Sequence, residues 1–436
     1  MIKKLVLVFI AIIAIQSHAQ EGTSSPYSFY GIGSLKFKGT VENRSMGGLS
    51  IYADSVHVNL RNPASYGEKN IGLYNNEGRP MKFAIGGTHT STKLSSDFGS
   101  DRVSSSTFDY FAVSLPMGKF GVGFGLMPFT SVGYKLENYN DNEDISTRFK
   151  GEGGVNRAYL SLGYLVIDGL SIGIDASYNF GNIKGSTIKY VYDDENELVQ
   201  YQSSENNRSD LSGLNINLGV LYKTKIKDNL ELVSGLTYSP QSDLKSRNER
   251  SFNTITILNA TGQEFIINTI EADLESQNLK ETSLVLPSKL SIGFGIGERT
   301  KWFVGAESVF LQTSKFNNDL YSSVDTDYEN SSAFILGGFY IPNFNSFRSY
   351  WKRIVYRAGI RTKKTGLKIN GESINEFGIS FGVGLPVGNN FLSNANLGFE
   401  FGNRGTTNKN LIKENFINFQ LSLSLNDRWF QKRKFD

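Results

Sequence analysis

Residues 170–180 read LSIGIDASYNF and decide the fold, because apolar side chains occupy every second position. Ile172, Ile174 and Tyr178 alternate with small or polar residues such as Gly173 and Asp175. A period of two is that of a β-strand with one apolar and one polar face. The same alternation recurs from about residue 81 to the end of the chain, for example in residues 120–126, 214–220, 290–296, 377–385 and 418–425.

The lengths of the connections separate a membrane barrel from a soluble β-sandwich. Strands are predicted near residues 82–94, 106–115, 119–138, 150–165, 169–188, 208–225, 229–242, 284–297, 301–313, 332–342, 351–366, 375–387, 390–402 and 413–426. The connections alternate between tight turns and longer loops. The tight turns lie near residues 116–118, 167–168, 227–228, 298–299, 342–349 and 386–388. The other connections include the long polar loops 189–207, 243–283 and 314–331. Outer-membrane barrels have short periplasmic turns, longer external loops and an even number of strands.

These features predict an all-β protein, a transmembrane antiparallel β-barrel of about 14 strands over residues 81–436, in the outer membrane of a Gram-negative bacterium. Both ends of the barrel then lie in the periplasm. Trp302, Trp351 and Trp429 all fall at predicted periplasmic strand ends, where amphipathic aromatic residues collect at the membrane interface.

The longest loop contains two strand-like pieces, residues 252–258 and 265–270, around a turn at residues 259–262. Each piece is shorter than the roughly 9 to 11 residues that a membrane-spanning β-strand needs. We therefore expect a hairpin that stands above the membrane, and a barrel of sixteen strands is the alternative.

The first residues have the pattern of a secretory signal peptide, which we assign to residues 1–19. Lys3 and Lys4 precede an apolar run at residues 5–15, and residues 17–19 form a small-x-small cleavage site. The run is shorter than the roughly 20 residues of a membrane-spanning helix. The sequence contains no cysteine, which excludes a lipid anchor at the cleavage site, disulfides and thiolate metal sites.

Composition agrees with an alternating β protein. The chain has 45 Gly, 31 Phe and 21 Tyr, only 9 Pro, and a mean hydropathy of −0.27. Removal of Lys3 and Lys4 with the signal leaves 43 of the 45 Lys and Arg residues against 42 Asp and Glu residues. This near-neutral balance argues against nucleic acid as a partner.

Residues 20–80 lack sustained alternation and carry clusters of small residues instead. The positions that define these clusters are Gly31, Gly33, Met46, Gly47, Gly48, Asp54, Asn62, Pro63 and Ala64. In their order and spacing they resemble the N-terminal hatch of the outer-membrane long-chain fatty acid transporters (FadL type). A second resemblance to that family lies at residues 286–288, which read LPS, followed by Gly293 and residues 302–307. From the residues alone, Asn62–Pro63–Ala64 is a turn, because proline fixes its own φ and keeps Asn62 out of the helical region.

The resemblance implies a barrel that its N-terminal hatch, residues 20–80, closes. It also implies a transporter of small hydrophobic compounds of the fatty acid type, with outer-membrane lipid and a small hydrophobic ligand as partners. Related barrels with the same Asn-Pro-Ala hatch serve as accessory subunits or plugs of the type IX secretion translocon. A translocon protein is therefore the alternative partner.

With the apolar positions assigned to lipid, the intervening polar positions face the lumen of the barrel. The predicted lumen-lining residues are Asp175, Asn215, Asn217, Glu307, Arg357, Arg361, Glu400, Asn418 and Gln420. Counted from the periplasmic strand ends, Glu307 and Arg357 lie at one level and Arg361 and Glu400 at another, each pair two strands apart. Such pairs stiffen the barrel as a charge-paired filling, or line a path that guides a passing molecule.

Other patterns indicate no catalytic chemistry. Glycine repeats at residues 121–125 and 293–297 lie inside strands, where they mark a thin face of the barrel and not a nucleotide loop. His57 and His89 are the histidines left after cleavage, and His89, next to Thr88 and Thr90, is the only one in a strand that could serve as the base of a hydrolase or acyltransferase. The acidic loop residues 141–144 and 193–195 are interpreted as solvated, and not as a calcium site. We expect no enzyme activity, metal or cofactor.

Overall fold

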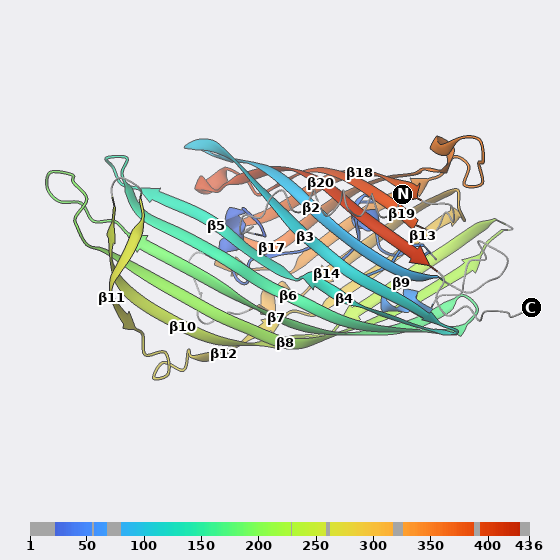
Figure 1. The fold of residues 1–436 in the computed structure, drawn as a ribbon, viewed down its shortest axis with the longest axis horizontal. Coiled ribbons are helices and arrows are strands. Elements are labelled where there is room, and N and C mark those ends of the chain that lie inside the picture. The colour runs from blue at the N-terminus through green and yellow to red at the C-terminus, as the bar shows by residue number, and fades with distance from the viewer. Residues whose placement is uncertain are drawn as a thin grey trace, which may run out of the picture.

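The structure is a computed structural model that describes residues 22–54, 56–67, 80–227, 229–258, 262–316, 326–387 and 393–427. Its body is a closed antiparallel barrel of 14 strands, in which β20 pairs with β2 (Figure 1). The prediction of the fold class and of the strand number is confirmed. Across the described ranges, no helix is long and apolar enough to cross a membrane. The predicted signal peptide and Trp429 lie outside the described residues.

Twenty strands account for the sheet. They are β1 (Ser34–Leu35), β2 (Met81–Ser96), β3 (Gly99–Met117), β4 (Phe120–Pro128), β5 (Thr130–Tyr139), β6 (Ile145–Ile167), β7 (Leu170–Lys189), β8 (Gln202–Lys225), β9 (Leu230–Ser239), β10 (Ser242–Ile257), β11 (Glu264–Glu271), β12 (Glu281–Leu286), β13 (Lys289–Glu298), β14 (Trp302–Leu311), β15 (Thr326–Tyr328), β16 (Ser331–Tyr340), β17 (Val355–Ile369), β18 (Glu372–Val387), β19 (Ser393–Arg404) and β20 (Lys413–Asp427).

Some wall positions consist of two strands that follow one another: β4 with β5, β9 with β10, β12 with β13, and β15 with β16. Proline explains two of these breaks, because it has no N–H group for the ladder. Pro240 separates β9 from β10, and Pro287 separates β12 from β13. The two breaks face each other, since Ser242 pairs with Leu286 on one side of them and Ser239 with Lys289 on the other.

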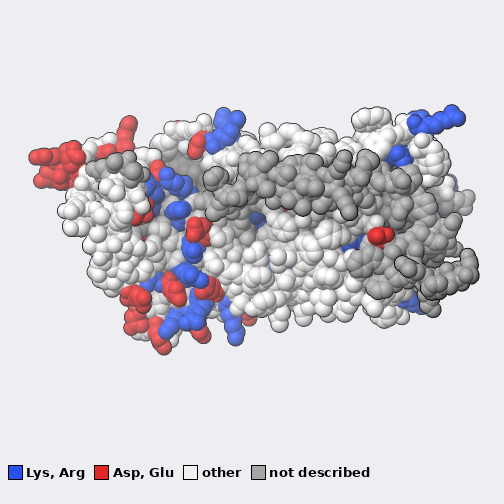
Figure 2. All heavy atoms as spheres, viewed as in Figure 1, with Lys and Arg blue, Asp and Glu red and all other residues white. Residues whose placement is uncertain are grey.

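Strand β7 confirms the alternation on which the prediction rests. Ser171, Asp175 and Ser177 are buried toward the lumen, whereas Ile172 and Ile174 are exposed on the outer face. Figure 2 shows the same division on the outside of the molecule: the middle of the visible face carries few charges, and charged side chains gather mainly at the end with the long loops. The apolar band is the surface that a barrel presents to lipid.

The two ends of the barrel differ as the loop lengths predicted. Trp302, the first residue of β14, and Trp351, in the short helix η4 (Tyr350–Arg353), both lie at the end with the short turns. At the opposite end, the predicted hairpin is present: β10 continues beyond the wall to Ile257 and pairs with β11. The sixteen-strand alternative is wrong, because β11 extends this hairpin and is not part of the wall.

Residues 22–67, with Ser55 outside the description, lie inside the barrel, and we call them the luminal segment (dark blue in Figure 1). The segment contains β1, which pairs with β5, and three short helices. These are η1 (Pro26–Phe29), α2 (Val41–Arg44) and η2 (Pro63–Gly67). Most of its residues are buried, so the segment supplies much of the core of the barrel.

A strip of glycine residues on neighbouring strands makes room for η2. A Cβ atom on Gly173 of β7 would lie 2.3 Å from the carbonyl carbon of Pro63, and one on Gly219 of β8 would lie 2.2 Å from Oδ1 of Asn62. The side chain of Asn62 donates to the Val220 carbonyl (3.0 Å) and accepts from the Ala64 amide (3.0 Å), which fixes the turn to the wall. Of the glycines from which a thin face was predicted, Gly121 and Gly123 lie against Tyr66 of η2, and Gly293 lies against Ile51.

Gly173→Ala tests this close approach. The added methyl group meets the backbone at Pro63 and forces the turn away from the wall, so we expect a loss of about 1–3 kcal/mol in the free energy of unfolding, typical of overpacking. Urea unfolding of the protein in lipid vesicles measures it. Gly99→Ala is the control, because no atom lies within 4 Å of a Cβ atom built there. Equal losses in both variants would contradict the fit.

Candidate functional site

The Met46–Gly47–Gly48 step seats the luminal segment on the opposite wall. Gly47 and Gly48 have φ values of +72° and +99°, in the region that favours glycine. The Gly47 amide donates to the hydroxyl of Ser380 on β18 (2.7 Å). A Cβ atom on Gly359 of β17 would lie 2.1 Å from the Met46 carbonyl carbon. The backbone of the step therefore lies directly against the wall, as the backbone of η2 does.

Glu307 on β14 is buried and binds the luminal segment. Its carboxylate pairs with the guanidinium of Arg61 (2.8 Å) and accepts from the Ser50 amide (2.8 Å). The hydroxyl of Ser291 on β13 donates to it as well (2.6 Å). Arg61 also donates to the Gly48 carbonyl (2.7 Å), so the ion pair connects β14 with the Met46–Gly47–Gly48 step as well.

Arg361 on β17 and Glu400 on β19 lie 2.6 Å apart, which confirms the pair predicted from their level in the barrel. Glu376, on β18 between them, binds Arg361 (2.8 Å) and Arg404 (2.6 Å). Arg44 of the luminal segment approaches Glu400 at 3.7 Å. The predicted pair is thus part of a larger network that again includes the segment.

Asp175 on β7 has a similar role. Its carboxylate accepts from Ser161 (3.0 Å) and Ser177 (2.6 Å), and it pairs with Lys38 of the luminal segment (3.2 Å). The pKa of Lys38 is lowered by burial, and the charge of Asp175 opposes that shift.

The predicted proximity of Glu307 and Arg357 does not produce an ion pair. Glu307 binds Arg61, as described, and Arg357 donates to the side-chain oxygen of Asn396 (3.1 Å). Asn396 in turn donates to Glu42 of the luminal segment (2.7 Å). The prediction is wrong because Glu307 is opposite Ile335, which is opposite Arg361, so Glu307 lies four residues from the level of Arg357. The luminal segment supplies the partner of Glu307, and Asn396 of β19 supplies that of Arg357.

The predicted amide residues also face the interior. Asn217 donates to the Arg61 carbonyl (3.1 Å), and Asn215 donates to the Ser242 hydroxyl (3.2 Å). Asn418 donates to Glu400 (3.0 Å), and Gln420 is near the same carboxylate (3.5 Å). Amide side chains thus satisfy the lone pairs that the arginines leave on the buried carboxylate.

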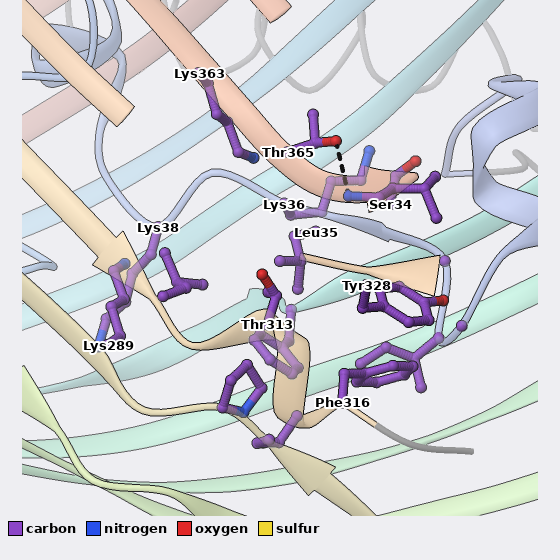
Figure 3. A pocket seen from close by; sticks show the side chains of 18 of the residues that line it. Ser34, Leu35, Lys36, Lys38, Lys289, Thr313, Phe316, Tyr328, Lys363 and Thr365 are labelled. Carbon is purple, nitrogen blue, oxygen red and sulfur yellow. Dashed lines mark hydrogen bonds between the residues drawn. The ribbon is translucent and has the colours of Figure 1, made fainter. Parts of the chain in front are cut away.

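A cavity of about 260 Å³ lies between the luminal segment and the part of the barrel toward the long loops. Gly31 and Gly33, both with positive φ, carry the chain along its edge. Its apolar lining comes from Tyr27, Tyr30, Ile32, Leu35, Phe129, Leu286, Leu311, Phe316, Tyr328, Leu367 and Ile374. In Figure 3, Leu35 lies among the lysine side chains, and Phe316 and Tyr328 lie next to each other on the opposite side.

Cationic side chains predominate among the charged residues that the structure describes around this cavity. They are Lys36, Lys38, Arg61, Arg157, Lys289, Lys363 and Arg404, against a single carboxylate, Glu376. Three of them come from different parts of the chain: Lys36 from the luminal segment, Lys289 from β13 and Lys363 from β17. Figure 3 shows these three side chains around the cavity. Burial lowers the pKa of Lys36 to about 8, and the negative charge of Asp109 opposes this shift.

The barrel wall lacks strand pairing at one place. β3 pairs with β4 only from Phe111 to Met117, and β5 pairs with β6 and with β1. Within the described ranges, no pairing joins β5 to the outer half of β3, and in Figure 1 the two strands diverge toward the long-loop end. We call this place the wall gap.

The luminal segment spans the wall gap from inside. The Ser24 hydroxyl donates to the Ser104 carbonyl of β3 (3.3 Å), and the Ser28 hydroxyl exchanges hydrogen bonds with the backbone of Gly133 on β5 (3.1 Å). A second cavity, of about 240 Å³, extends from Lys36 and Leu35 to Ser105 of β3. The two cavities share lining residues, so together they lead from the centre of the barrel to the gap.

The remaining candidates form no recognisable catalytic site. The carboxylate of Asp54 binds the ring of His57 (2.8 Å), and His89 contacts the Ser106 hydroxyl (2.8 Å) on an exposed strand face. In the part of the chain that the structure describes, no cluster of three or more His, Cys, Asp or Glu residues has the geometry of a metal site.

Sequence reasoning missed the charged residues of the luminal segment. Lys36, Lys38, Arg44 and Arg61 stand against only Glu42 and Asp54 among the described residues of that segment. This excess of positive charge opposite inward-facing acidic positions was a usable signal. Glu376 and Arg404 were missed too, although both follow the alternation of their strands.

Comparisons with known proteins agree with the fold. A family model described as BamG matches residues 1–436. Solved structures with a similar fold include the Pseudomonas putida toluene transporter TodX (TM-score 0.56, 14% identity, 91% of this chain and 99% of that chain). A Pseudomonas aeruginosa FadL homologue (0.55, 12%, 90% and 99%) and the Ralstonia pickettii toluene transporter TbuX (0.52, 15%, 89% and 98%) are also similar. At these identities the likeness shows a FadL-type fold alone. No curated protein matches the chain.

Glu307→Gln tests how firmly the luminal segment is held. The change leaves the buried Arg61 without its counter-charge, so we expect a loss of about 3–5 kcal/mol in the free energy of unfolding. Urea titration in lipid vesicles measures it. Glu298→Gln, which removes a surface pair with Lys301, is the control and costs at most about 1 kcal/mol.

The double variant Arg61→Met/Glu307→Gln separates the ion pair from other effects of the substitutions. Because neither charge remains, its loss should be smaller than the sum of the two single losses. Simple additivity would show that Arg61 and Glu307 are not coupled.

Proposed function

The chain belongs to the BamG family, and we propose that it is a non-enzymatic barrel that carries small amphipathic anions across part of the outer membrane. The observation that carries this proposal is the cavity of about 260 Å³, whose wall is apolar and whose charged residues are nearly all cationic. An apolar body fits the first property and a negative group fits the second. A fatty acid, with one carboxylate on an aliphatic chain, is the simplest molecule that combines them.

The positions of the lysines support an anionic and not a neutral ligand. Three of the seven cationic side chains around the cavity pair with a carboxylate: Lys38 with Asp175, Arg61 with Glu307, and Arg404 with Glu376. Lys36 instead donates to the Gly22 carbonyl, a neutral acceptor. An anion beside Lys36 would favour its charged form, which burial otherwise disfavours.

The wall gap supports a lateral route for such a molecule. A ligand with an aliphatic chain is more stable in lipid than in the aqueous periplasm. The second cavity leads from Lys36 toward Ser105, next to the place where the pairing of β3 and β5 is missing. We propose that the ligand passes from the central cavity through the gap into the outer leaflet, after residues 24–28 of the luminal segment move aside.

The fold supports a location in the outer membrane. A closed barrel with an apolar outer band is the structure that spans the outer membrane of Gram-negative bacteria. The toluene transporters with a similar fold are transport proteins by their titles. For this chain, transport without catalysis is part of the proposal.

A second function has its own support. The ion pairs of Glu307, Glu400 and Asp175 bind the luminal segment to three parts of the wall. This arrangement favours a barrel that stays closed and acts as a plug or accessory subunit of a type IX secretion translocon. That function requires a stable protein partner and no ligand in the cavity, so ligand binding separates the two proposals.

Binding of laurate tests the first proposal. The protein in detergent micelles should bind laurate more tightly than dodecanol, measured by isothermal titration calorimetry. Because the pKa of Lys36 is about 8 without ligand, laurate binding above that pH requires the uptake of a proton. The affinity for laurate should therefore fall at least tenfold between pH 7 and pH 10, and that for dodecanol should not change.

Lys36→Met should remove most of this pH dependence and reduce the preference for laurate over dodecanol. Lys301→Met is the matched control, because Lys301 is exposed at the short-turn end of the barrel. If laurate and dodecanol bind equally well, or neither binds, the transporter proposal fails and the plug function is favoured.

Ser105→Trp tests the lateral route. Ser105 lines the cavity next to the wall gap, so an indole there should slow the uptake of radiolabelled laurate at least tenfold and leave laurate binding at the central cavity within twofold. Uptake is measured in cells that produce the variant. Ser106→Trp changes the next residue, which faces His89 on the other side of the strand, and should have little effect. Equal uptake by both variants would argue against passage through the gap.

A further inference from the structure

β11 is an exposed edge strand. It pairs with the end of β10 and, within the described ranges, with no other strand. All eight of its residues are exposed, and four of them are large and apolar. Their exposed fractions are 41% for Phe265, 60% for Ile266, 57% for Ile267 and 63% for Ile270.

These apolar residues do not belong to the lipid-facing band. On β8 the band ends at Leu214, and the pairing of Ser251 with both Asn206 and Glu271 places the base of β11 eight residues further along β8. At about 3.4 Å per residue and a strand tilt near 40°, this is roughly 20 Å above the band. Figure 2 shows charged side chains over this end of the barrel, as expected for a surface in water.

An apolar edge strand in water is normally protected. Proteins place lysine or proline on such a strand, or cover it, because its unpaired N–H and C=O groups otherwise attract another strand. The sequence FIINTI, residues 265–270, contains neither residue, and no described part of the chain covers it. Exposed patches of this kind mark sites of interaction with other proteins.

We propose that β11 binds an extended segment of another protein, which adds to its free edge as a further antiparallel strand. Main-chain hydrogen bonds would provide the affinity, and alternate apolar side chains of the segment would pack beside Ile266 and Ile270. The docking surface is β11 itself, on the outside of the cell.

Charge identifies the kind of segment. Glu264 and Glu271 stand at the two ends of β11, and Asp273 and Glu275 follow. A partner strand with lysine or arginine at both ends of an apolar stretch is therefore complementary. A second copy of this chain is not, because antiparallel pairing of two β11 strands places Glu264 of one against Glu271 of the other, and like charges opposite each other destabilise a sheet.

A polar cavity of about 770 Å³ adjoins the same hairpin, and acidic and basic side chains both line it. Glu264, Thr269 and Glu271 contribute one side of it, and Arg208 of β8 and Arg250 of β10 contribute the other.

Synthetic peptides test the proposal on the full-length protein in nanodiscs. The probe is a fluorescently labelled peptide of sequence KVTVTVTK, and fluorescence anisotropy measures its affinity. We expect binding that weakens at least tenfold in EVTVTVTE, whose ends carry the wrong charge. It should weaken equally in a KVTVTVTK peptide N-methylated at alternate residues, which cannot form the ladder.

Ile266→Lys/Ile270→Lys places two lysines on the edge strand and should reduce KVTVTVTK binding at least tenfold. Both side chains are exposed, so the barrel should still fold. The change in electrophoretic mobility between unheated and heated samples verifies that it does. Phe98→Lys, at the equally external β2–β3 turn, is the matched control and should bind normally. Equal binding by all three proteins, or no binding to the unchanged protein, overturns the proposal. A dimer of the unchanged protein that Ile266→Lys/Ile270→Lys dissociates in mass photometry also overturns it, in favour of self-association.

Discussion

The ion pair between Glu307 and Arg61 is the contact on which the interior of this barrel depends. A carboxylate buried away from water requires a charged partner and further hydrogen-bond donors, and Arg61, Ser50 and Ser291 supply them. Two of these three residues come from the luminal segment. The wall is therefore not complete by itself: Glu307 and Asp175 have their cationic partners, Arg61 and Lys38, in the luminal segment. The glycine strips on β7, β8 and β17 allow the segment to come close enough.

Period-two alternation was sufficient to predict the strands and the side of the wall on which Asp175, Glu307 and Glu400 lie. Counting along strands also predicted the pair of Arg361 with Glu400, because both residues belong to regular strands of known tilt. Counting along strands did not predict the partners of Arg357. This side chain donates to Asn396, which in turn donates to Glu42 of the luminal segment. That segment has no repeating pattern, so its contacts depend on tertiary packing that alternation does not describe. The wall gap was missed for a related reason, since residues 119–138 have the pattern of one strand although the structure divides them at Phe129.

Two properties of the interior favour different functions. Most of the buried charges are paired, which stabilises the closed state of the barrel. The cavity above them keeps an apolar wall and an excess of cations, which is costly unless a ligand or solvent compensates it. The two properties are compatible when the luminal segment is regarded as two parts. Residues 40–67 form the closely packed floor, and residues 22–38 line the cavity and span the wall gap. There they contact β3 through the hydrogen bond of Ser24, and β5 through the short strand β1 and the hydrogen bonds of Ser28.

The facing prolines divide part of the wall into two cooperative units. Pro240 and Pro287 interrupt adjacent strands at one level, so the ladder between β10 and β12 is not continuous with that between β9 and β13. Amide protection from hydrogen exchange depends on such ladders. Opening of β10 and β12 by thermal fluctuation need not therefore propagate into the membrane-embedded β9 and β13. Because β10 also carries the external hairpin and pairs with the unbroken strand β8, a mechanical load on β11 would reach the part of the wall that lipid surrounds through β8, and not through β12 and β13.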